Sequence, residues 1–504
     1  MTRAQMSLPA FVDERANRLD DRVAVRCEAG RLTYAEVADL SARAAQLLAA
    51  AGVRRGDRVL TAVGNTLDLP VSLVAAARLG AILVPLNHEH RGEMLRYMVS
   101  QAAPSAVICD ADRLDHRQRE DVRVSAPDAA WFDRADFLAI ARDHAPRTGD
   151  GRPDDAAAIF FTSGTTGRSK GAVLSQRFLL FEAESQIRVA GSGKDEVFWT
   201  ALPLFHTNAL CLTLLGAWLA EGRAVVRDRF SASRFWEQIR QDQATVANLL
   251  GAMVPILLKT HPDPVRDHRL RLAIGGGVPP AAVREFKQRF SVGFREVYGL
   301  TETGLNAVQT SADDVIGSVG KPLPNWDIRV DAGPGNDGEI QIRGREPGTL
   351  FDGYWQEPDR TGDAMTDDGF FRTGDLGRFD ADGYLYFRGR IKECIRRRGE
   401  NISPVEVEFS ALQHPLISEC VAVAVPSELA EDEVKLVYVL REDADLSPAD
   451  LHAFCERQMA PYMVPRYLER RDSLPRTQTQ KIERRQLTGL GSGVHDMDRR
   501  EDKR

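Results

Sequence analysis

Residues 161–171 form a loop rich in glycine and hydroxyl groups that separates two apolar runs. The runs Ala156–Phe161 and Ala172–Leu174 have the composition of buried strands, which would hold the loop rigidly on a sheet. The loop itself contains three glycines, five hydroxyl side chains and no carboxylate. Small residues let backbone N–H groups approach an anion closely, and the hydroxyl groups add donors. The loop therefore predicts a binding site for a triphosphate.

Two other interpretations of this loop have to be weighed. It is not the common nucleotide-binding P-loop, because Gly164 is not followed five residues later by Gly-Lys-Ser or Gly-Lys-Thr. A run of Gly, Ser and Thr before a lysine is also typical of a plain surface loop. The apolar strands on either side favour the phosphate site over the surface loop.

Composition limits the class of protein. The 504 residues allow two to four domains, and 43% hydrophobic with 28% charged residues is usual for a globular protein. A net charge of -7 gives no general attraction to nucleic acid, and no apolar run is long enough to cross a bilayer. Six scattered cysteines without a CxxC pair favour a reducing compartment. We expect a cytoplasmic protein without a nucleic-acid partner, either a monomer or a homodimer.

Strand-like runs alternate with helical runs through most of the chain, which predicts an α/β fold of layered subdomains. Helices are expected over 34–52, 69–79 and 233–241, and strands over 59–63, 224–226 and 246–250. Short strands between Gly, Pro and Asp turns predict a small β-rich subdomain over about 317–389. We expect an N-terminal domain over 1–389, a small α+β domain over 390–487 and a disordered tail over 488–504.

Two further segments carry residues suited to nucleotide chemistry. Gly275, Gly276 and Gly277 follow a strand, and a backbone without side chains can lie flat against a planar ligand such as adenine, although a simple turn is the alternative. In the segment 298–303, Tyr298 offers a ring for stacking, and Glu302 offers a hard oxygen ligand for Mg²⁺. An ordinary turn does not require both an aromatic ring for stacking and a carboxylate for a metal.

These segments resemble the motifs of the acyl-adenylate-forming (ANL) superfamily, which comprises acyl- and aryl-CoA synthetases, nonribosomal adenylation domains and luciferases. Motifs similar to those of the family recur in the same order between about residues 30 and 485. The chain is most similar to AMP-forming acyl-CoA synthetases, among them carnitine-CoA ligase-like enzymes for short or polar acids. The motifs lie at 32–36, 52–59, 78–87, 161–171, 202–208, 274–280, 298–303, 371–377, 389–393, 399–408 and 474–482.

The resemblance implies a reaction and a set of roles. ATP, with Mg²⁺, would convert a small carboxylic acid to an acyl-adenylate, and CoA would then accept the acyl group while the small C-terminal domain turns about Lys392. The implied catalytic residues are Lys481, Thr301, Glu302 (which is also the Mg²⁺ ligand) and His206. The residues implied to bind ATP or AMP are Thr162, Ser163, Gly164, Thr165, Thr166, Gly167, Lys170, Gly275, Gly276, Gly277, Tyr298, Gly299, Thr301, Asp375 and Arg390. Those implied to surround the acid are His206, Asn208, Gly299, Thr303 and Gly304.

The resemblance leaves other functions open. Gln480 stands where the family usually has glycine. This difference permits an adenylating enzyme with another acceptor, such as a carrier protein or an amine, or a diazotase that activates nitrite for an aromatic amine. A non-catalytic binding module is disfavoured because Lys481, Glu302 and Asp375 are all present. The basic run Arg396–Arg398 is interpreted either as a solvated face or as a patch for CoA phosphates.

Overall fold

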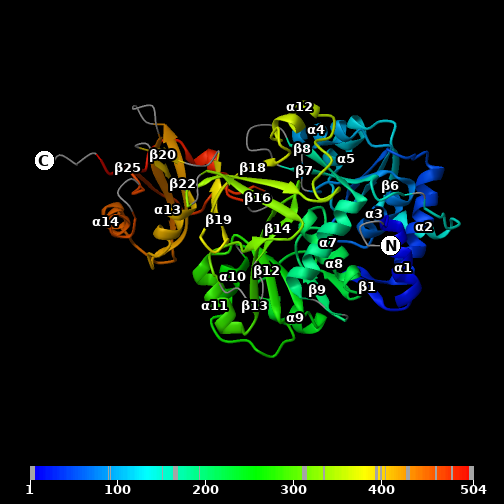
Figure 1. Cartoon of the computed structure of the whole chain (residues 1–504), viewed down its shortest axis with the longest axis horizontal. Coiled ribbons are helices and arrows are strands. Elements are labelled where there is room, and N and C mark those ends of the chain that lie inside the picture. The colour runs from blue at the N-terminus through cyan, green and yellow to red at the C-terminus, as the bar shows by residue number, and fades with distance from the viewer. Residues whose placement is uncertain are drawn as a thin grey trace. The chain divides into compact units, whose positions relative to one another are not determined.

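In the computed structural model, the chain forms two compact units (Figure 1). The N-terminal unit comprises Met1–Ile328 and Ile342–Arg372, and the C-terminal unit comprises Arg329–Gln341 and Thr373–Arg504. The structure describes residues 6–88, 90, 92–149, 151–162, 169–191, 193, 195–251, 253–308, 315–332, 335–391, 395–397, 400–402, 404–426, 432–459, 463–477 and 481–498.

A nine-stranded sheet forms one layer of the N-terminal unit, in the order β15-β14-β13-β12-β11-β9-β10-β1-β2. The strands from β13 to β1 are parallel, and antiparallel strands close both edges. The parallel strands have largely apolar sequences because both of their faces are covered. The bounds are β1 Val23–Cys27, β2 Gly30–Thr33, β9 Val197–Thr200, β10 Arg223–Val226, β11 Val246–Leu250, β12 Leu272–Gly276, β13 Gly293–Leu300, β14 Gly304–Val308 and β15 Lys321–Pro322.

A second sheet has six strands in the order β6-β5-β3-β4-β7-β8. The last pair, β7 and β8, is antiparallel and flanks the glycine-rich loop, which confirms the two strands expected there. The bounds are β3 Arg58–Ala62, β4 Ile82–Pro85, β5 Ala106–Cys109, β6 Ala130–Asp133, β7 Ala156–Thr162 and β8 Lys170–Ser175.

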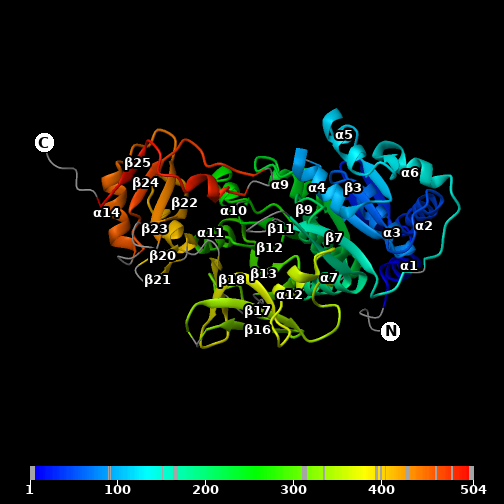
Figure 2. The same ribbon diagram turned by 90° about the horizontal axis from the view of Figure 1, so that it is seen from above.

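Buried helices pack against these sheets. All residues of α3 (Asp68–Leu79) are buried, and it contacts β3, β4 and β7 as well as α2 (Tyr34–Ala50), which lies beside it in Figure 2. Helix α7 (Gln176–Ala190) contacts β7, β8, β14 and the π-helix η2 (Asn208–Leu215). The remaining helices are α1 Leu8–Leu19, α4 Gly92–Ala102, α5 His116–Ser125, α6 Arg134–Arg142, α8 Gly216–Leu219, α9 Phe235–Asp242, α10 Met253–Thr260, α11 Pro280–Phe290 and α12 Pro358–Asp363. These layers confirm the predicted α/β class.

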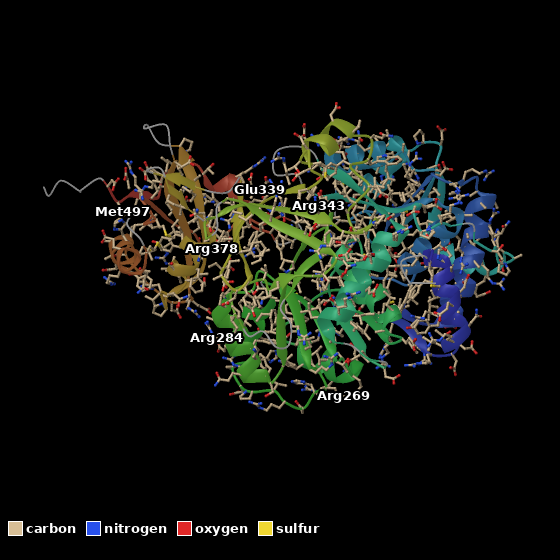
Figure 3. The ribbon with its side chains drawn as sticks, viewed as in Figure 1. Arg269, Arg284, Glu339, Arg343, Arg378 and Met497 are labelled. Carbon is tan, nitrogen blue, oxygen red and sulfur yellow. The ribbon has the colours of Figure 1, made fainter. Side chains whose placement is uncertain are left out.

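A four-stranded sheet in the order β16-β17-β18-β19 contains the segments at which the chain passes between the units. Within the C-terminal unit, Glu339 of β17, labelled in Figure 3, accepts a hydrogen bond at 3.0 Å from the N–H of Gly374. The bounds are β16 Trp326–Asp331, β17 Gly338–Gly344, β18 Phe371–Phe379 and β19 Leu385–Arg390.

The rest of the C-terminal unit is a second four-stranded sheet, in the order β22-β23-β24-β25, with two helices and a short strand pair. One face of this sheet is covered by a core that includes residues of both helices, and the other by Leu474 and Leu487. The bounds are β20 Ile395–Arg397, β21 Glu400–Ile402, α13 Pro404–Ala411, β22 Ile417–Pro426, β23 Asp432–Leu440, α14 Pro448–Gln458, β24 Tyr467–Arg470 and β25 Val494–Asp496.

The tail differs from the disorder expected over 488–504. Strand β25 pairs with β24, and Arg466 forms an ion pair with Asp496 at 3.0 Å. Strand pairing and this ion pair order the tail as far as residue 498, although its composition is rich in Gly, Arg and Asp. Within the described residues, no helix is long and apolar enough to cross a membrane.

Candidate functional site

Tyr354 connects Lys170, near the end of the glycine-rich loop, to Glu302, the predicted Mg²⁺ ligand. The Lys170 amino group donates to the Tyr354 hydroxyl at 2.9 Å, and this hydroxyl donates to Oε1 of Glu302, also at 2.9 Å. Lys170 opens β8 and pairs with Thr162 at the end of β7, so both ends of the loop are fixed on the sheet. Burial, and then the Glu302 carboxylate, raise the pKa of the Tyr354 phenol. Tyr354 therefore remains a neutral donor to Glu302.

Tyr354 lies outside the motifs that the sequence offers as candidate site segments. Its signal is weak, because one tyrosine in the run Phe351–Trp355 has the pattern of an ordinary core aromatic residue. Its role depends on contacts with residues far away in the sequence, which no local pattern reveals. The ring also lies 4.1 Å from the Lys170 amino nitrogen, at cation–π distance.

The motif Tyr298–Thr303 forms the end of β13 and the turn into β14. Within the turn, the side chain of Thr303 is buried, and its hydroxyl accepts a hydrogen bond from the N–H of Leu300 at 3.2 Å. Glu302 is 7% exposed, and its carbonyl accepts from the N–H of Phe351 at 2.9 Å. The turn therefore holds Thr301 and Glu302 next to each other, with Tyr298 on the adjacent strand.

The three glycines of the predicted adenine segment lie at the carboxyl end of β12. A Cβ on Gly275 would stand 2.4 Å from the carbonyl oxygen of Leu249, so only glycine allows this approach of β11 and β12. The N–H of Gly277 donates to Oε1 of Glu296 at 3.1 Å. Burial raises the pKa of Glu296 to about 7. This buried carboxyl group, which no sequence motif marks, supports the glycine segment from β13.

His206 and Asn208 lie where a loop runs into the π-helix η2. His206 is exposed, and its ring packs edge-on against Phe205 at 4.9 Å. Asn65 fixes the loop, because its Oδ1 accepts from the N–H of Leu204 at 2.8 Å and its Nδ2 donates to the carbonyl of Leu202 at 3.0 Å. His206 is therefore not a residue of the hydrophobic core. π-Helical segments are rare and are frequently found at functional sites.

In the C-terminal unit, Asp375 and Arg390 come together as a pair. They face each other across the β18–β19 ladder, and Nε of Arg390 lies 2.7 Å from Oδ1 of Asp375. Asp375 is 1% exposed, and its N–H donates to the Thr373 hydroxyl at 3.0 Å. The two residues implied to bind ribose or phosphate are therefore held at one position of the sheet.

Lys481 is an exposed residue of the C-terminal unit. Its N–H donates to the Thr477 hydroxyl at 3.2 Å, and its carbonyl accepts from the N–H of Thr477 at 2.7 Å. An antiparallel bridge also pairs Arg476 with Ile482. The predicted site residues Ser163, Gly164, Thr165, Thr166, Gly167 and Lys392, together with Gln480, lie outside the described residues.

One arginine of the basic run has a structural role. Arg397 is 4% exposed, forms an ion pair with Glu433 at 2.6 Å and donates to the carbonyl of Val464 at 2.8 Å. Its guanidinium is therefore engaged within the C-terminal unit, which corrects both the solvated-face and the CoA-phosphate interpretations at this position.

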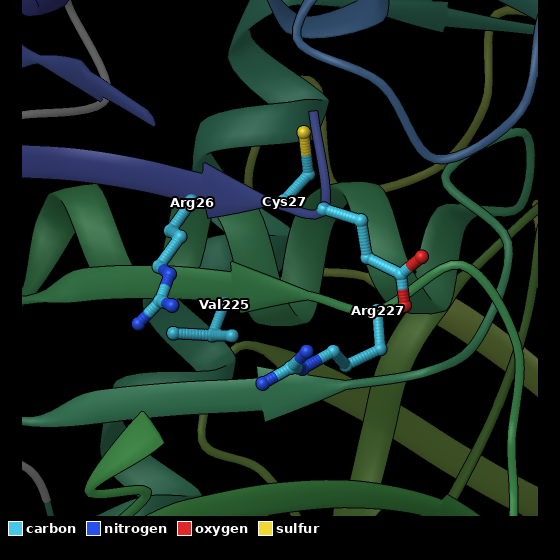
Figure 4. Close-up of a pocket in the computed structure, with 5 residues that line it drawn as sticks. Arg26, Cys27, Val225 and Arg227 are labelled. Carbon is cyan, nitrogen blue, oxygen red and sulfur yellow. The ribbon is translucent and has the colours of Figure 1, made fainter. Parts of the chain in front are cut away.

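A separate pocket lies beside strands β1 and β10, with a volume of about 180 Å³ (Figure 4). It is lined by Arg26, Cys27, Glu28, Val225 and Arg227, none of which is a predicted site residue. The buried carboxylate of Asp242 binds Arg227 in a bidentate manner at 2.7 and 2.8 Å. Because this carboxylate balances the charge of Arg227, we assign the pair to the stability of the sheet.

Comparison with known proteins places the chain in a family. Residues 12–355 match the AMP-binding enzymes, and residues 406–481 match the AMP-binding enzyme C-terminal domain. A sulfoacetate–CoA ligase of Cupriavidus necator is 32% identical over 471 residues, covering 90% of this chain and 92% of that protein. A crotonobetaine/carnitine–CoA ligase of Salmonella paratyphi B is 31% identical over 492 residues, covering 91% and 93%. ATP-bound MatB from Rhodopseudomonas palustris is 29% identical with a TM-score of 0.87, covering 96% of this chain and 98% of that chain.

The chain therefore belongs to the AMP-binding enzyme family, and within the ANL superfamily it is an acyl-CoA synthetase. It is an ATP-dependent, AMP-forming ligase that activates a carboxylic acid as its acyl-adenylate and transfers the acyl group to CoA. These findings support CoA as the acceptor rather than a carrier protein, an amine or the nitrite chemistry that the sequence had left open.

Proposed function

We propose that this ligase acts on a short, polar carboxylic acid and that the contacts among Lys170, Tyr354 and Glu302 organise its phosphate chemistry. The main support for this role in phosphate chemistry is the Tyr354 hydroxyl, which contacts both Lys170 and Glu302 at 2.9 Å. Tyr354 thereby holds a cation suited to the β- and γ-phosphates near a carboxylate suited to a metal. The named activities of the two curated relatives, on sulfoacetate and on crotonobetaine or carnitine, support a short polar acid.

The described residues fit a Mg²⁺ ion that is shared with the nucleotide. In the described ranges, no group of three or more His, Cys, Asp or Glu residues is arranged to hold a metal ion. Mg²⁺ usually takes one or two carboxylates and completes its shell with water and substrate phosphates, so the single carboxylate of Glu302 is sufficient. When bound, the ion would neutralise phosphate charge. Glu302 would hold it while Tyr354 keeps the carboxylate oriented.

The remaining roles follow the family pattern. Tyr298 would stack on adenine beside Gly275–Gly277, with Gly299 next to it. Thr301 would donate to the α-phosphate. His206, with Asn208, Thr303 and Gly304, would border the acid. In the C-terminal unit, Asp375 would accept from the ribose hydroxyls and Arg390 would support it, while Lys481 would bridge the acid carboxylate and the α-phosphate.

We also propose that the chain is organised as domains over 1–389 and 390–487, with Lys392 as the pivot of the second. The acid and ATP are both anions, so adenylation needs a cation between them, whereas CoA attack needs an open path to the acyl carbonyl. A hinge lets one site perform both steps in turn. A cytoplasmic location, where ATP and CoA are available, suits this reaction.

An activity screen tests the assignment. Short acids with and without polar end groups are incubated with ATP and Mg²⁺, and pyrophosphate and AMP release are measured with and without CoA. We expect adenylation with at least one polar acid and a thioester product only when CoA is present. Turnover confined to long-chain or apolar acids would contradict the proposed substrate class.

A further inference from the structure

A buried carboxyl group lies against the wall where the proposed function places the acid. Helix α7 contacts β14, and its residue Glu182 is 4% exposed. A Cβ built on Gly304, the first residue of β14, would stand 3.3 Å from Cγ and 3.4 Å from Cδ of Glu182. The carboxyl group is therefore in contact range of a proposed substrate residue. The reaction steps assigned above do not use it.

One oxygen of the Glu182 carboxyl group accepts no hydrogen bond within the described residues. The carboxyl group takes a hydrogen bond from the buried thiol of Cys211 on η2. Its Oε2 atom is buried, and within the described residues it has no hydrogen-bond partner. Burial raises the pKa of Glu182 to about 8. Leaving a buried oxygen unpaired is costly, so its retention points to a partner that binds there.

A second unused acceptor occurs one helical turn further along α7. Gln186 is fully buried and lies on the same face as Glu182, because residues four apart are neighbours on a helix. Its Nε2 donates to Oδ1 of Asn248 at 3.0 Å, and Nδ2 of Asn248 donates to the hydroxyl of Thr213 at 2.7 Å. Oε1 of Gln186 has no partner among the residues that the structure describes.

Oε1 of Gln186 can only accept a hydrogen bond. Oε2 of Glu182 accepts when the carboxyl group is ionised, as it would be beside an ammonium group, or when the proton of the neutral acid lies on Oε1. Glu182 and Gln186 both lie on α7, which contacts η2 and β14, and the unpaired oxygen of each is buried. An apolar chain end would leave both oxygens unpaired, whereas a hydroxyl or ammonium group would supply the missing donors.

We propose that the acid substrate carries a hydrogen-bond donor, a hydroxyl or an ammonium group, at the end remote from its carboxylate, and that Glu182 and Gln186 receive it. Glu182 is then a residue that determines specificity. This inference rests on the proposed position of the acid beside Thr303 and Gly304. It narrows the substrate class from polar acids to acids that carry a donor.

The test compares acids of equal length that differ only at the far end: butyrate, 4-hydroxybutyrate and 4-aminobutyrate, together with shorter and longer homologues of each. The value of kcat/KM for AMP formation is measured with CoA present. We expect the wild-type protein to favour one donor-bearing series over the apolar series by about tenfold or more.

Substitutions then assign the preference to Glu182. Glu182→Leu removes the acceptor and should lower the preference by about tenfold or more, while turnover of the apolar acid shows that the variant is folded. Glu182→Gln keeps an acceptor oxygen but cannot carry a charge. It should therefore lower kcat/KM for the acids with an ammonium group and leave kcat/KM for the hydroxy acids unchanged. Glu184→Gln is the control, since Glu184 is only half-buried and pairs with Arg188 on the same helix.

The outcomes separate this inference from the proposed function. Equal use of the three series by the wild-type protein, as expected if trapped water satisfies the acceptors, would overturn it. An unchanged preference in Glu182→Leu would do the same. If the apolar series alone is used, both the inference and the polar-acid proposal fail. If no acid supports AMP formation, the proposed function fails first and removes the basis of the inference.

Discussion

Tyr354 connects two charged residues that the sequence places far apart. Its hydroxyl accepts from Lys170 and donates to Glu302, so each charged group limits the movement of the other. Hydrogen bonds to charged groups are stronger than neutral ones, at about 1.5–3 kcal/mol net. Loss of the hydroxyl should therefore affect the step in which phosphate charge is handled.

We predict that Tyr354→Phe slows adenylate formation by about tenfold or more, because the ring still packs while both charged side chains lose their shared partner. Pyrophosphate release measures this step. Thioester formation from a supplied acyl-adenylate should change much less. Tyr386→Phe is the control, since its hydroxyl donates to Asp380 at 3.2 Å. Wild-type pyrophosphate release in Tyr354→Phe would show that the hydroxyl is dispensable.

Glu296 predicts a pH dependence of stability. Burial raises the pKa of its carboxyl group from 4.5 to about 7. Between these values the folded chain binds a proton that the unfolded chain does not, so this group makes stability fall as pH rises and then level off above about 7. Glu296→Gln should remove that fall, on the order of 3 kcal/mol.

Urea unfolding of both proteins between acidic and mildly basic pH measures the effect. The difference in unfolding free energy between variant and wild type should grow in favour of the variant as pH rises. The amide oxygen introduced by Glu296→Gln can still accept from the N–H of Gly277, so the backbone contact is preserved. Two curves that stay parallel across this range would contradict the assignment.

At the scale of elements, the turn between β13 and β14 depends on glycine. A Cβ on Gly299 would stand 2.1 Å from the carbonyl oxygen of Gly304, which is backbone and cannot rotate away. We predict that Gly299→Ala separates the two strands and lowers stability by about 1–3 kcal/mol. It should also raise KM for ATP, because Tyr298 and Thr301 move with the turn.

A second glycine provides the matched control. Gly362 lies in α12, and a Cβ there would meet nothing within 4 Å. Alanine is the better helix former, so Gly362→Ala should be neutral or stabilising by up to about 1 kcal/mol. Thermal unfolding and ATP titration of both variants test the pair. Equal melting temperatures would rule out strain at the turn.

The elements also show what local sequence can and cannot reveal. Apolar periodicity predicted α2 and α3, and the strands β7 and β8 on either side of the glycine-rich loop, because burial imposes that pattern on neighbouring residues. The π-helix η2 was missed, since its run of apolar residues carries no π-helical signal. Likewise, the roles of Tyr354 and Arg397 depend on partners distant in sequence.

At the scale of the whole molecule, each of the two compact units has hydrophobic cores of its own. The N-terminal unit contains the cores on its two sheets, and the C-terminal unit contains those on either side of β22 and β23. In the latter unit, Leu474 and Leu487 are buried while Lys481, between them in sequence, is exposed. The Lys481 side chain can therefore be shortened without opening a core.

This arrangement makes Lys481→Ala a clean test of the two half-reactions. We predict that it abolishes adenylate formation, because no cation then offsets the repulsion between the acid carboxylate and the α-phosphate. A supplied acyl-adenylate should still react with CoA, since that step needs no such cation. Stability should stay within about 0.5 kcal/mol of wild type, as for exposed substitutions. Pyrophosphate release and thioester formation are measured separately.

Arg441→Ala is the control for Lys481→Ala, because it removes another exposed cation of the C-terminal unit. It should leave both half-reactions intact. If Lys481→Ala still forms the adenylate at a near wild-type rate, the bridging role is wrong. An equal loss of both half-reactions at unchanged stability would instead place Lys481 in both steps. That result would argue against a C-terminal domain that withdraws this residue before CoA attacks.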